Sequence, residues 1–295
     1  MHNRRVALSF ALLVCVAGLV SACGGAEDTA PPVATPTVTL SHAQAPAGSP
    51  LDITYKFVVA ENAKFDEDYR VFVHVVDVDE EFMWDADHDP VVPTTQWKPG
   101  QTVEYTRTIF VPVFPYVGEA TIQVGLHSKS DGHRLTLAGD PAGQNAYRVA
   151  RVQLLPQTDN LLTIFKDGWH QAEVAGDNAT IEWQWTKREA VLAFRNPKKD
   201  ATFFLDVDSP GGEFHGPQQI RVVVNGQTVD QFTLGVGERT LRRASLKAAQ
   251  LGDREMAELQ IRVDRSWTPA QVPEARSTDK RELGVRVFHA FVDPR

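Results

Sequence analysis

The carboxylates between residues 77 and 89 form the densest group of side chains that could take part in chemistry. Within this acidic segment Asp85, Asp87 and Asp89 stand at alternate positions, as in the first half of a calcium-binding loop. Carboxylate oxygens spaced in this way can surround one Ca²⁺ ion. The sixth and twelfth positions of the pattern lack the glycine and the glutamate of an EF-hand. Two interpretations remain, a Ca²⁺ site of another type and a solvated acidic hairpin between the strand at 69–78 and the chain that follows Pro93, and we favour the hairpin.

Catalysis by the same carboxylates is an alternative, because glycoside hydrolysis needs two carboxyl groups held at a fixed separation. The sequence contains no Gly-x-Ser-x-Gly elbow, no His-Glu-x-x-His, no P-loop and no Gly-x-Gly-x-x-Gly. A zinc site of His74, His88 and Asp87 is a further alternative. His74 lies between Val73 and Val75, which is more typical of a histidine within a sheet. We therefore expect a protein that is not an enzyme and needs no cofactor, and Ca²⁺ is the favoured candidate among the two ions.

Aromatic side chains offer a different chemistry, because their faces can stack on sugar rings. Trp97 belongs to a loop, residues 94–100, where burial is less assured than in a strand. Asp279 and Arg281 precede the last predicted strand, and their spacing favours a structural ion pair, with ligand contact as the alternative. The candidate ligand-binding residues are Trp84, Trp97, Tyr116, Trp169, Asp279 and Arg281.

The first residues have the pattern of an export signal. Arg4 and Arg5 precede an apolar run, residues 6–20, of the length found in signal peptides and short of a membrane-spanning helix. The run ends in Leu-Val-Ser-Ala-Cys, which resembles the bacterial lipobox. The resemblance implies cleavage between Ala22 and Cys23 and transfer of lipid to the Cys23 thiol. Several acyl chains together would anchor the protein firmly, since each buried CH₂ contributes ~0.8 kcal/mol.

The composition sets limits on stability and on partners. The chain has two cysteines, and Cys15 lies in the predicted signal peptide, so no disulfide can form within the mature chain. Acidic residues outnumber basic ones by 38 to 30, for a net charge of −8. No cluster of basic and aromatic residues is present, so nucleic acid is not an expected partner.

Strand patterns dominate the chain, and they fall into two blocks. Residues 51–58 alternate apolar and polar side chains, as in a strand with one buried face. Residues 110–116 contain two prolines and cannot continue a central strand, so we expect a sheet edge or a crossing between sheets there. Strands of the first block are predicted at 38–43, 50–60, 69–78, 102–110, 119–128 and 146–154. Their number and the turns between them favour an antiparallel sandwich of immunoglobulin-like size.

The second block follows a boundary at residues 155–160. Asn225-Gly226 between two apolar runs is the strongest hairpin signal in the chain. One short helical turn is expected within residues 245–256. Strands are predicted at 180–185, 190–196, 201–207, 219–224, 228–234, 258–263 and 283–292. This pattern predicts a second sandwich of jelly-roll type.

A resemblance supports the reading of the second block. Gly168-Trp169, Val224-Asn225-Gly226, Trp267-Thr268-Pro269-Ala270 and the most specific piece, residues 279–285 (Asp-Lys-Arg-Glu-Leu-Gly-Val), are similar to an accessory β-sandwich module. That module is found at the C-termini of some bacterial cell-surface glycosyltransferases and methyltransferases. The resemblance implies a carbohydrate-associated domain and assigns it no catalytic residue.

Together these patterns predict an all-β lipoprotein of the cell envelope. We expect a signal peptide (1–22), a disordered tether (23–37), an N-terminal β-sandwich (38–156) and a C-terminal β-sandwich (163–295). The expected partners are the membrane, through lipidated Cys23, and a surface glycan or an envelope protein. The expected location is the cell membrane, on its periplasmic side, or the outer membrane. A polysaccharide hydrolase and a structural Ca²⁺-binding lipoprotein are the alternatives.

Overall fold

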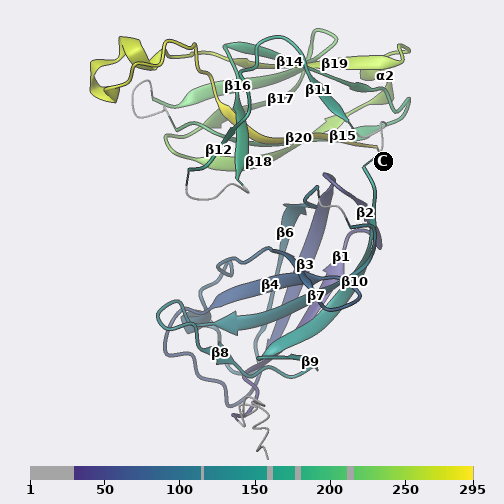
Figure 1. The fold of residues 1–295 in the computed structure, drawn as a ribbon, viewed down its shortest axis with the longest axis vertical. Coiled ribbons are helices and arrows are strands. Elements are labelled where there is room, and N and C mark those ends of the chain that lie inside the picture. The colour runs from purple at the N-terminus through teal and green to yellow at the C-terminus, as the bar shows by residue number, and fades with distance from the viewer. Residues whose placement is uncertain (1–29, 114–115, 158–161, 177–180, 211–215, 295) are drawn as a thin grey trace, which may run out of the picture.

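The computed structural model describes residues 30–113, 116–157, 162–176, 181–210 and 216–294. These residues form two pairs of β-sheets that follow one another along the chain (Figure 1). The strands pair antiparallel except for β2 and β10, which run parallel. The prediction of an all-β protein built from sandwiches is therefore confirmed.

The first pair of sheets shares one buried core. A three-stranded sheet has the order β1-β3-β6, and a larger sheet has the order β2-β10-β7-β4-β5, with β8 on β7 and β9 on β10. The strands are β1 (Ala34–Leu40), β2 (Gln44–Pro46), β3 (Pro50–Val59), β4 (Arg70–Val76), β5 (Phe82–Asp85), β6 (Thr102–Phe110), β7 (Gly118–His127), β8 (Arg134–Leu135), β9 (Asp140–Gly143) and β10 (Ala146–Leu155). A 3-10 helix, Thr94–Gln96, lies between β5 and β6.

The second pair of sheets has a separate buried core. The two sheets have the orders β11-β14-β19-β16-β17 and β12-β13-β20-β15-β18. Their strands are β11 (Thr163–Phe165), β12 (Glu173–Val174), β13 (Glu182–Trp185), β14 (Glu189–Arg195), β15 (Ala201–Asp208), β16 (Gln218–Val224), β17 (Gln227–Leu234), β18 (Arg239–Leu246), β19 (Met256–Val263) and β20 (Arg286–Pro294). The helices are α2 (Ala248–Leu251) and two 3-10 turns, Pro269–Gln271 and Pro273–Ala275.

The period-two pattern of the sequence explains how each sheet buries one face. Along β3 the apolar side chains of Leu51, Ile53, Tyr55 and Phe57 are almost wholly buried, while the residues between them are more exposed. In the opposing sheet Val71, Val73 and Val75 of β4 meet them. Burial of such side chains stabilises the folded state by ~1.5–3 kcal/mol each, before the entropy of ordering is counted.

The chain enters the first sheet earlier than the sequence predicted. Strand β1 begins at Ala34, so residues 34–37 of the predicted tether are paired with β3. Ala34 and Pro36 are buried, because alternation carries their side chains into the core. A proline is tolerated here because β1 is an edge strand and its second side has no ladder to complete. Residues 23–29, like the signal peptide, lie outside the described residues.

Two turn predictions are confirmed. The proline-rich stretch after Phe110 leads from β6 in one sheet to β7 in the other, so the chain crosses between sheets there. Asn225 and Gly226 join β16 to β17, and both have positive φ angles, 47° and 77°. Two consecutive residues of this kind are what a tight hairpin with right-handed strand twist requires.

Strand β18 was missed from the sequence. Its residues pair with β15 over their whole length, from Leu246 to Arg239. Ala244 and Leu246 are buried, whereas arginines occupy three of the remaining positions, which masks the apolar alternation. The short helix α2 lies inside the segment where one helical turn was predicted.

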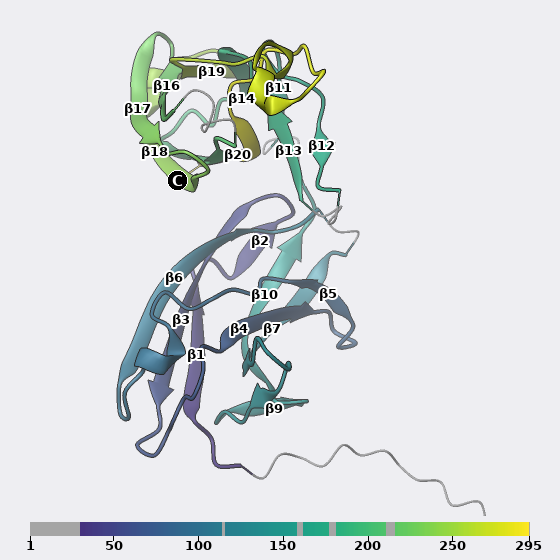
Figure 2. The same cartoon turned by 90° about the vertical axis from the view of Figure 1, so that its left-hand side faces the viewer.

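The two sandwiches meet at the end of β6. The ring of Phe110 lies flat on the imidazole of His289, with ring centroids 4.0 Å apart and planes inclined by 2°. Arg243 of β18 binds both carboxylate oxygens of Asp52 on β3, at 2.6 and 3.0 Å, and also bonds to Thr108. Figure 2 shows β18 and β20 above the ends of β2 and β6.

No helix among the described residues is long and apolar enough to cross a membrane.

Candidate functional site

The aromatic candidate residues differ in how deeply their side chains are buried in the two sandwiches. Trp97 is only 5% exposed and donates its indole N–H to the carbonyl of Val92, so its ring faces are not presented to a ligand. The sequence expectation for Trp97 as an exposed loop aromatic is therefore wrong. The reason is that the loop folds its tryptophan against Phe57 and Phe65.

The other aromatic candidates are half-buried. Trp84 and Tyr116 pack against the first core, and the Tyr116 hydroxyl donates to the carbonyl of Glu119. Trp169 packs against the second core, donates its indole N–H to Val191 and meets Phe165 edge-on. Trp84, Tyr116 and Trp169 thus have structural contacts, and each keeps part of its surface in solvent.

The three aspartates of the calcium-loop pattern point to separate partners. Asp87 accepts a hydrogen bond from the backbone N–H of Val73, and Asp89 pairs with Lys129. Asp85 is exposed at the end of β5. Within the described residues no group of three or more His, Cys, Asp or Glu side chains is arranged to hold a metal ion. The acidic segment lies in a hairpin other than the expected one: β4 pairs with β5, a strand inside the segment, through residues 77–81. The expectation that the strand after Pro93 completes the hairpin is wrong, because that strand, β6, pairs with β3 in the other sheet.

Asp279 and Arg281 form the structural ion pair that their spacing favoured. Arg281 binds Asp279 through Nε and Nη2 and binds Glu173 of β12 through Nη1. Hydrogen bonds from Arg281 hold the pKa of Asp279 below its ordinary value. The pair therefore fastens the loop before β20 to the edge strand β12. Cys23 and Ala22, the predicted lipidation and cleavage residues, lie outside the described residues.

The outer face of the larger N-terminal sheet brings together polar residues that no sequence motif had linked. Side chains at paired positions of neighbouring strands lie on the same face, about 4.8 Å apart. Two such rows cross the sheet from β5 to β10: Phe82, Val76, Thr121 and Arg151 form the first, and Asp85, His74, Gln123 and Arg148 the second. We call these eight residues the outer face. It joins the exposed ring of Phe82 to hydroxyl, imidazole, carboxylate and guanidinium groups, whereas Val76 and the Gln123 amide are buried between them.

A β-bulge places both arginines on this face. Residues three apart on a regular strand point to opposite sides of a sheet. The register between β10 and β7 shifts between Arg148 and Ala150, so Val149 is the extra residue and Arg151 pairs with Thr121. Arg148 and Arg151 therefore both face outward, while Tyr147 and Val152 on either side of them remain in the core. Bulges commonly re-aim side chains in this way near binding sites.

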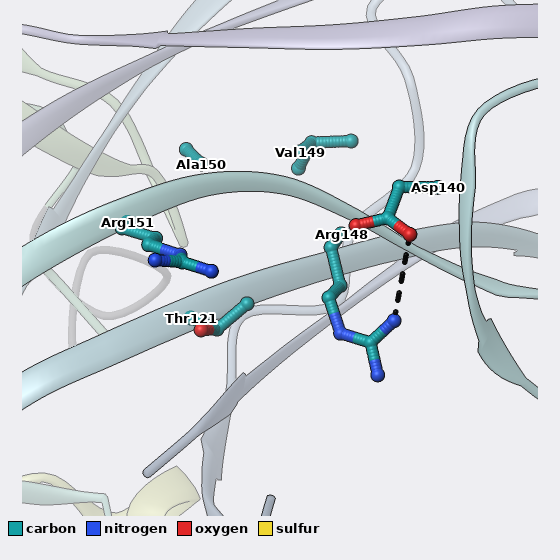
Figure 3. A pocket seen from close by; sticks show the side chains of 6 residues that line it. All are labelled: Thr121, Asp140, Arg148, Val149, Ala150 and Arg151. Atoms are coloured by element: carbon teal, nitrogen blue, oxygen red, sulfur yellow. Dashed lines mark ion pairs between the residues drawn. The ribbon is translucent and has the colours of Figure 1, made fainter. Parts of the chain in front are cut away.

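The two arginines border a shallow pocket of about 230 Å³ (Figure 3). Its lining comprises Thr121, Asp140, Arg148, Val149, Ala150 and Arg151. In Figure 3 Arg148 and Arg151 extend on either side of Thr121, and Asp140 lies beyond Arg148. The pocket thus opens where the bulge separates β10 from the regular pairing of β7.

Arg148 and Arg151 differ in how firmly they are held. Arg148 binds Glu80, at the turn between β4 and β5, and bonds to the carbonyl of Pro141; its distance to Asp140 is 3.6 Å. Among the described residues the Arg151 side chain has one ion-pair partner, Glu119 at 3.3 Å, and it is 68% exposed. Arg148 is consequently a fixed part of the wall, and Arg151 is an accessible cation at the rim.

Aromatic groups occupy the opposite side of the outer face. Phe82 is 56% exposed, and its ring meets the imidazole of His74 edge-on at 5.3 Å. His74 also contacts Phe72, which Arg134 covers at 4.2 Å from the ring centroid. Burial lowers the pKa of His74, so its ring is neutral at pH 7. His74 therefore offers one donor and one acceptor rather than a charge.

Sequence reasoning missed Phe82, Thr121, Gln123, Arg148 and Arg151 as a group. Each residue is ordinary in its own strand, and only the pairing of β10, β7, β4 and β5 brings them together. The one signal available was the unusual run Tyr-Arg-Val-Ala-Arg-Val, residues 147–152. Its apolar residues fit no unbroken two-residue period, as expected for a strand with a bulge.

The chain is thus an all-β protein with two sandwiches and a polar, arginine-bearing sheet face. No protein-family model matches it, and no curated protein matches its sequence. Among solved structures, a β-glucuronidase of Bacteroides uniformis aligns with 88% of this chain and 30% of its own length, at 9% identity and a TM-score of 0.32. This chain therefore spans less than a third of that enzyme.

Two further structures show likenesses of similar size. The CBM51-2 and INT domains of Clostridium perfringens ZmpB, in complex with GlcNAc, align with 60% of this chain and 38% of that chain, at 10% identity and a TM-score of 0.26. An exo-β-1,3-galactanase of Phanerochaete chrysosporium with galactose aligns with 88% and 57%, at 8% identity and a TM-score of 0.28.

Proposed function

We propose that this protein is an exported lipoprotein, anchored through Cys23, that binds glycans without cleaving them. The observation that carries glycan binding is the first row of the outer face. There the exposed ring of Phe82 shares a sheet face with Thr121 and Arg151. A sugar ring has an apolar face of C–H groups and a rim of hydroxyls. A stacking ring flanked by donors and acceptors on a rigid sheet complements both parts.

A non-catalytic role is supported by the way the acidic hairpin uses its carboxylates. Asp77 accepts hydrogen bonds from the backbone N–H groups of Asp79 and Glu81 and so closes the turn. Glu80 is bound to Arg148, and Asp87 to the backbone of β4. Carboxylates with these partners hold the hairpin over the sheet, and a hydrolase would need two of them directed at a substrate.

Glycan binding is tested with the lipidated protein in nanodiscs on an array of neutral and charged glycans. We expect retention of a subset of glycans, and Phe82→Ala should weaken it about tenfold, because the stacking surface is lost while the fold is kept. Val78→Ala is the matched control, since Val78 is 64% exposed near the same hairpin turn but carries no ring. Absence of retention for every glycan would refute the proposal.

The anchor is tested independently of the ligand. Cys23→Ser removes the thiol that would carry the lipid, so the protein should lose its acyl label and pass from the membrane fraction to the soluble exported fraction. A change of the nearby Ser21→Ala keeps the thiol and serves as the control. Membrane retention of the Cys23→Ser protein would contradict the proposed anchor.

A further inference from the structure

The pocket at the bulge is lined unequally by its two arginines, and this inequality points to the class of ligand. Arg148 has its guanidinium engaged by Glu80 and by the carbonyl of Pro141. Arg151 makes one contact, at 3.3 Å, with the half-exposed carboxylate of Glu119. An exposed ion pair of this kind is exchanged for another carboxylate at little cost. The accessible cation of the pocket is therefore Arg151.

The surroundings of Arg151 limit what can bind there. A guanidinium group presents parallel N–H donors that match the two oxygens of a carboxylate. Thr121, its partner across the strand pair, adds a hydroxyl group at the pocket wall. The volume of about 230 Å³ is below the ~300–1,000 Å³ of pockets that enclose drug-sized ligands, so the pocket suits a single ring of a longer chain.

Glu119 binds Arg151 with the same functional group that we infer for the ligand, a carboxylate. It precedes Ala120 on β7, and its half-exposed carboxylate lies 3.3 Å from the Arg151 guanidinium. A ligand carboxylate that approaches Arg151 must displace Glu119. The pair shows that the Arg151 guanidinium is placed to bind a carboxylate, although Asp140 adds a negative charge to the same pocket.

We propose that the outer face binds acidic saccharides, chains that contain uronic acid or another carboxylate-bearing ring, with the carboxylate on Arg151. This inference rests on the proposed glycan-binding function and names its ligand class. Phe82 stacks on another ring of the same saccharide, three strand spacings or about 14 Å from Arg151 across the sheet. Arg148 is a positioning residue, because it holds the β4–β5 turn and β9 in place through Glu80 and Pro141.

The probes are a pair of oligosaccharides that differ only in charge. Oligogalacturonate carries free carboxylates, and its methyl ester has the same rings without the charge. Binding of both to the lipidated protein in nanodiscs is measured by calorimetry at two salt concentrations. We expect the acid to bind about tenfold more tightly than the ester, with a preference that decreases as salt increases.

Two substitutions of the exposed pair should act in opposite directions. Arg151→Gln should abolish the preference for the acid and leave the affinity for the ester unchanged. Glu119→Gln should raise the affinity for the acid severalfold, because the internal competitor is removed. A merely structural role of the pair would weaken binding of both probes in both variants. Arg195→Gln, at an exposed position of β14 in the other sandwich, is the matched control.

The outcomes separate this inference from the proposed function. Equal binding of acid and ester, unaffected by Arg151→Gln, would overturn the inference while glycan binding remains. Failure of both probes and of the array would remove the proposed function itself. Binding of polyglutamate as tight as that of the oligogalacturonate would show that the site selects acidic peptides, and this too would overturn the assignment to saccharides.

Discussion

His88 is a titratable side chain enclosed between two tyrosines inside the N-terminal sandwich. It is 3% exposed, and its ring lies 4.8 Å from that of Tyr55 and 5.6 Å from that of Tyr105. The Nδ1 atom lies 2.9 Å from the carbonyl of Ala86 and can only donate to it, so Nε2 accepts the hydrogen bond from the Tyr105 hydroxyl. The neutral ring with its proton on Nδ1 satisfies both contacts.

Burial lowers the pKa of His88 from 6.5 to about 4. Because the folded state binds the proton less readily than the unfolded state, stability is full above pH 6.5 and falls as the pH decreases toward 4. We predict that this residue alone removes about 3 kcal/mol of the free energy of unfolding between pH 7.5 and pH 4. Urea unfolding at a series of pH values measures the slope.

The substitution His88→Gln isolates this contribution. Its unfolding free energy should be lower than that of the unsubstituted protein at pH 7.5, and the difference should shrink by about 3 kcal/mol at pH 4. The exposed His42→Gln should leave the pH dependence unchanged. A constant difference between the two proteins across this pH range would show that the buried imidazole does not control acid stability.

At the scale of elements, the sequence predicts turns and strands whose conformation depends on residues close together along the chain. Asn225 and Gly226 specify their turn through their own backbone preferences, so the β16–β17 hairpin was recognisable without any partner. The alternation in β3 likewise reflects one strand and one buried face. Each of these features depends on residues that are neighbours along the chain.

The candidate site depends on pairing between strands that are distant in sequence. Arg151 and Phe82 lie on one face only because β10, β7, β4 and β5 are aligned in a particular register. A shift of one residue would reverse the face of every side chain beyond it. Strand β18 was hidden for a related reason, since its arginines pair with Asp206, Asp230 and Asp52 of other strands.

Because Val149 is an extra residue in β10, its deletion should cost less free energy of unfolding than deletion of a residue in a regular strand. Removal of Val149 leaves Arg148 opposite Gln123 and Ala150 opposite Ile122, so the strand becomes regular and no core residue changes face. We predict a loss of less than about 2 kcal/mol in the free energy of unfolding. Thermal and urea unfolding provide the measurement.

Removal of Gln123 is the matched control, because β7 has no spare residue to absorb the deletion. Its register with β4 is continuous, so the deletion directs core residues such as Ile122 or Val124 outward on one side. The expected loss is at least about 3 kcal/mol, the cost of exposing one or two large apolar side chains. Similar losses for the two deletions would contradict the role assigned to the bulge.

At the scale of the whole molecule, a network of rings and charges begins where the two sandwiches meet and runs along the outer side of β15, β18 and β20. His289, which stacks on Phe110, also bonds to Asp206 at 3.2 Å, and Asp206 binds Arg239 through both oxygens. Arg239 in turn lies 3.6 Å above the ring of Phe288. Burial acts to raise the pKa of Asp206, but hydrogen bonds from Arg239 and His289 outweigh it and hold the pKa below its ordinary value.

This network has a consequence for the relative orientation of the sandwiches. The ionised Asp206 orients the imidazole of His289, and Phe110 of the other sandwich stacks on this ring. Arg243 forms a bidentate ion pair with Asp52 at a second place in the junction. Because the two contacts lie at separate points, we predict that together they restrain the angle between the two sandwiches.

We predict that the junction side chains hold the two sandwiches in one relative orientation. Spin labels on exposed cysteines introduced at Glu61 and Arg195, one in each sandwich, should give one narrow distance distribution in the unsubstituted protein. Asp52→Asn combined with Phe110→Ala removes the charge and the stacked ring from the N-terminal side, and the distribution should broaden as the sandwiches move independently. Thr54→Val is the matched control, since Thr54 lies two residues from Asp52 on the same face of β3 and bonds only to Thr106. An equally narrow distribution in the Asp52→Asn, Phe110→Ala protein would mean that the linker alone sets the angle. Broadening in that protein and not in the control would assign the rigidity of the molecule to the junction, because the side chains there are all that the substitutions remove.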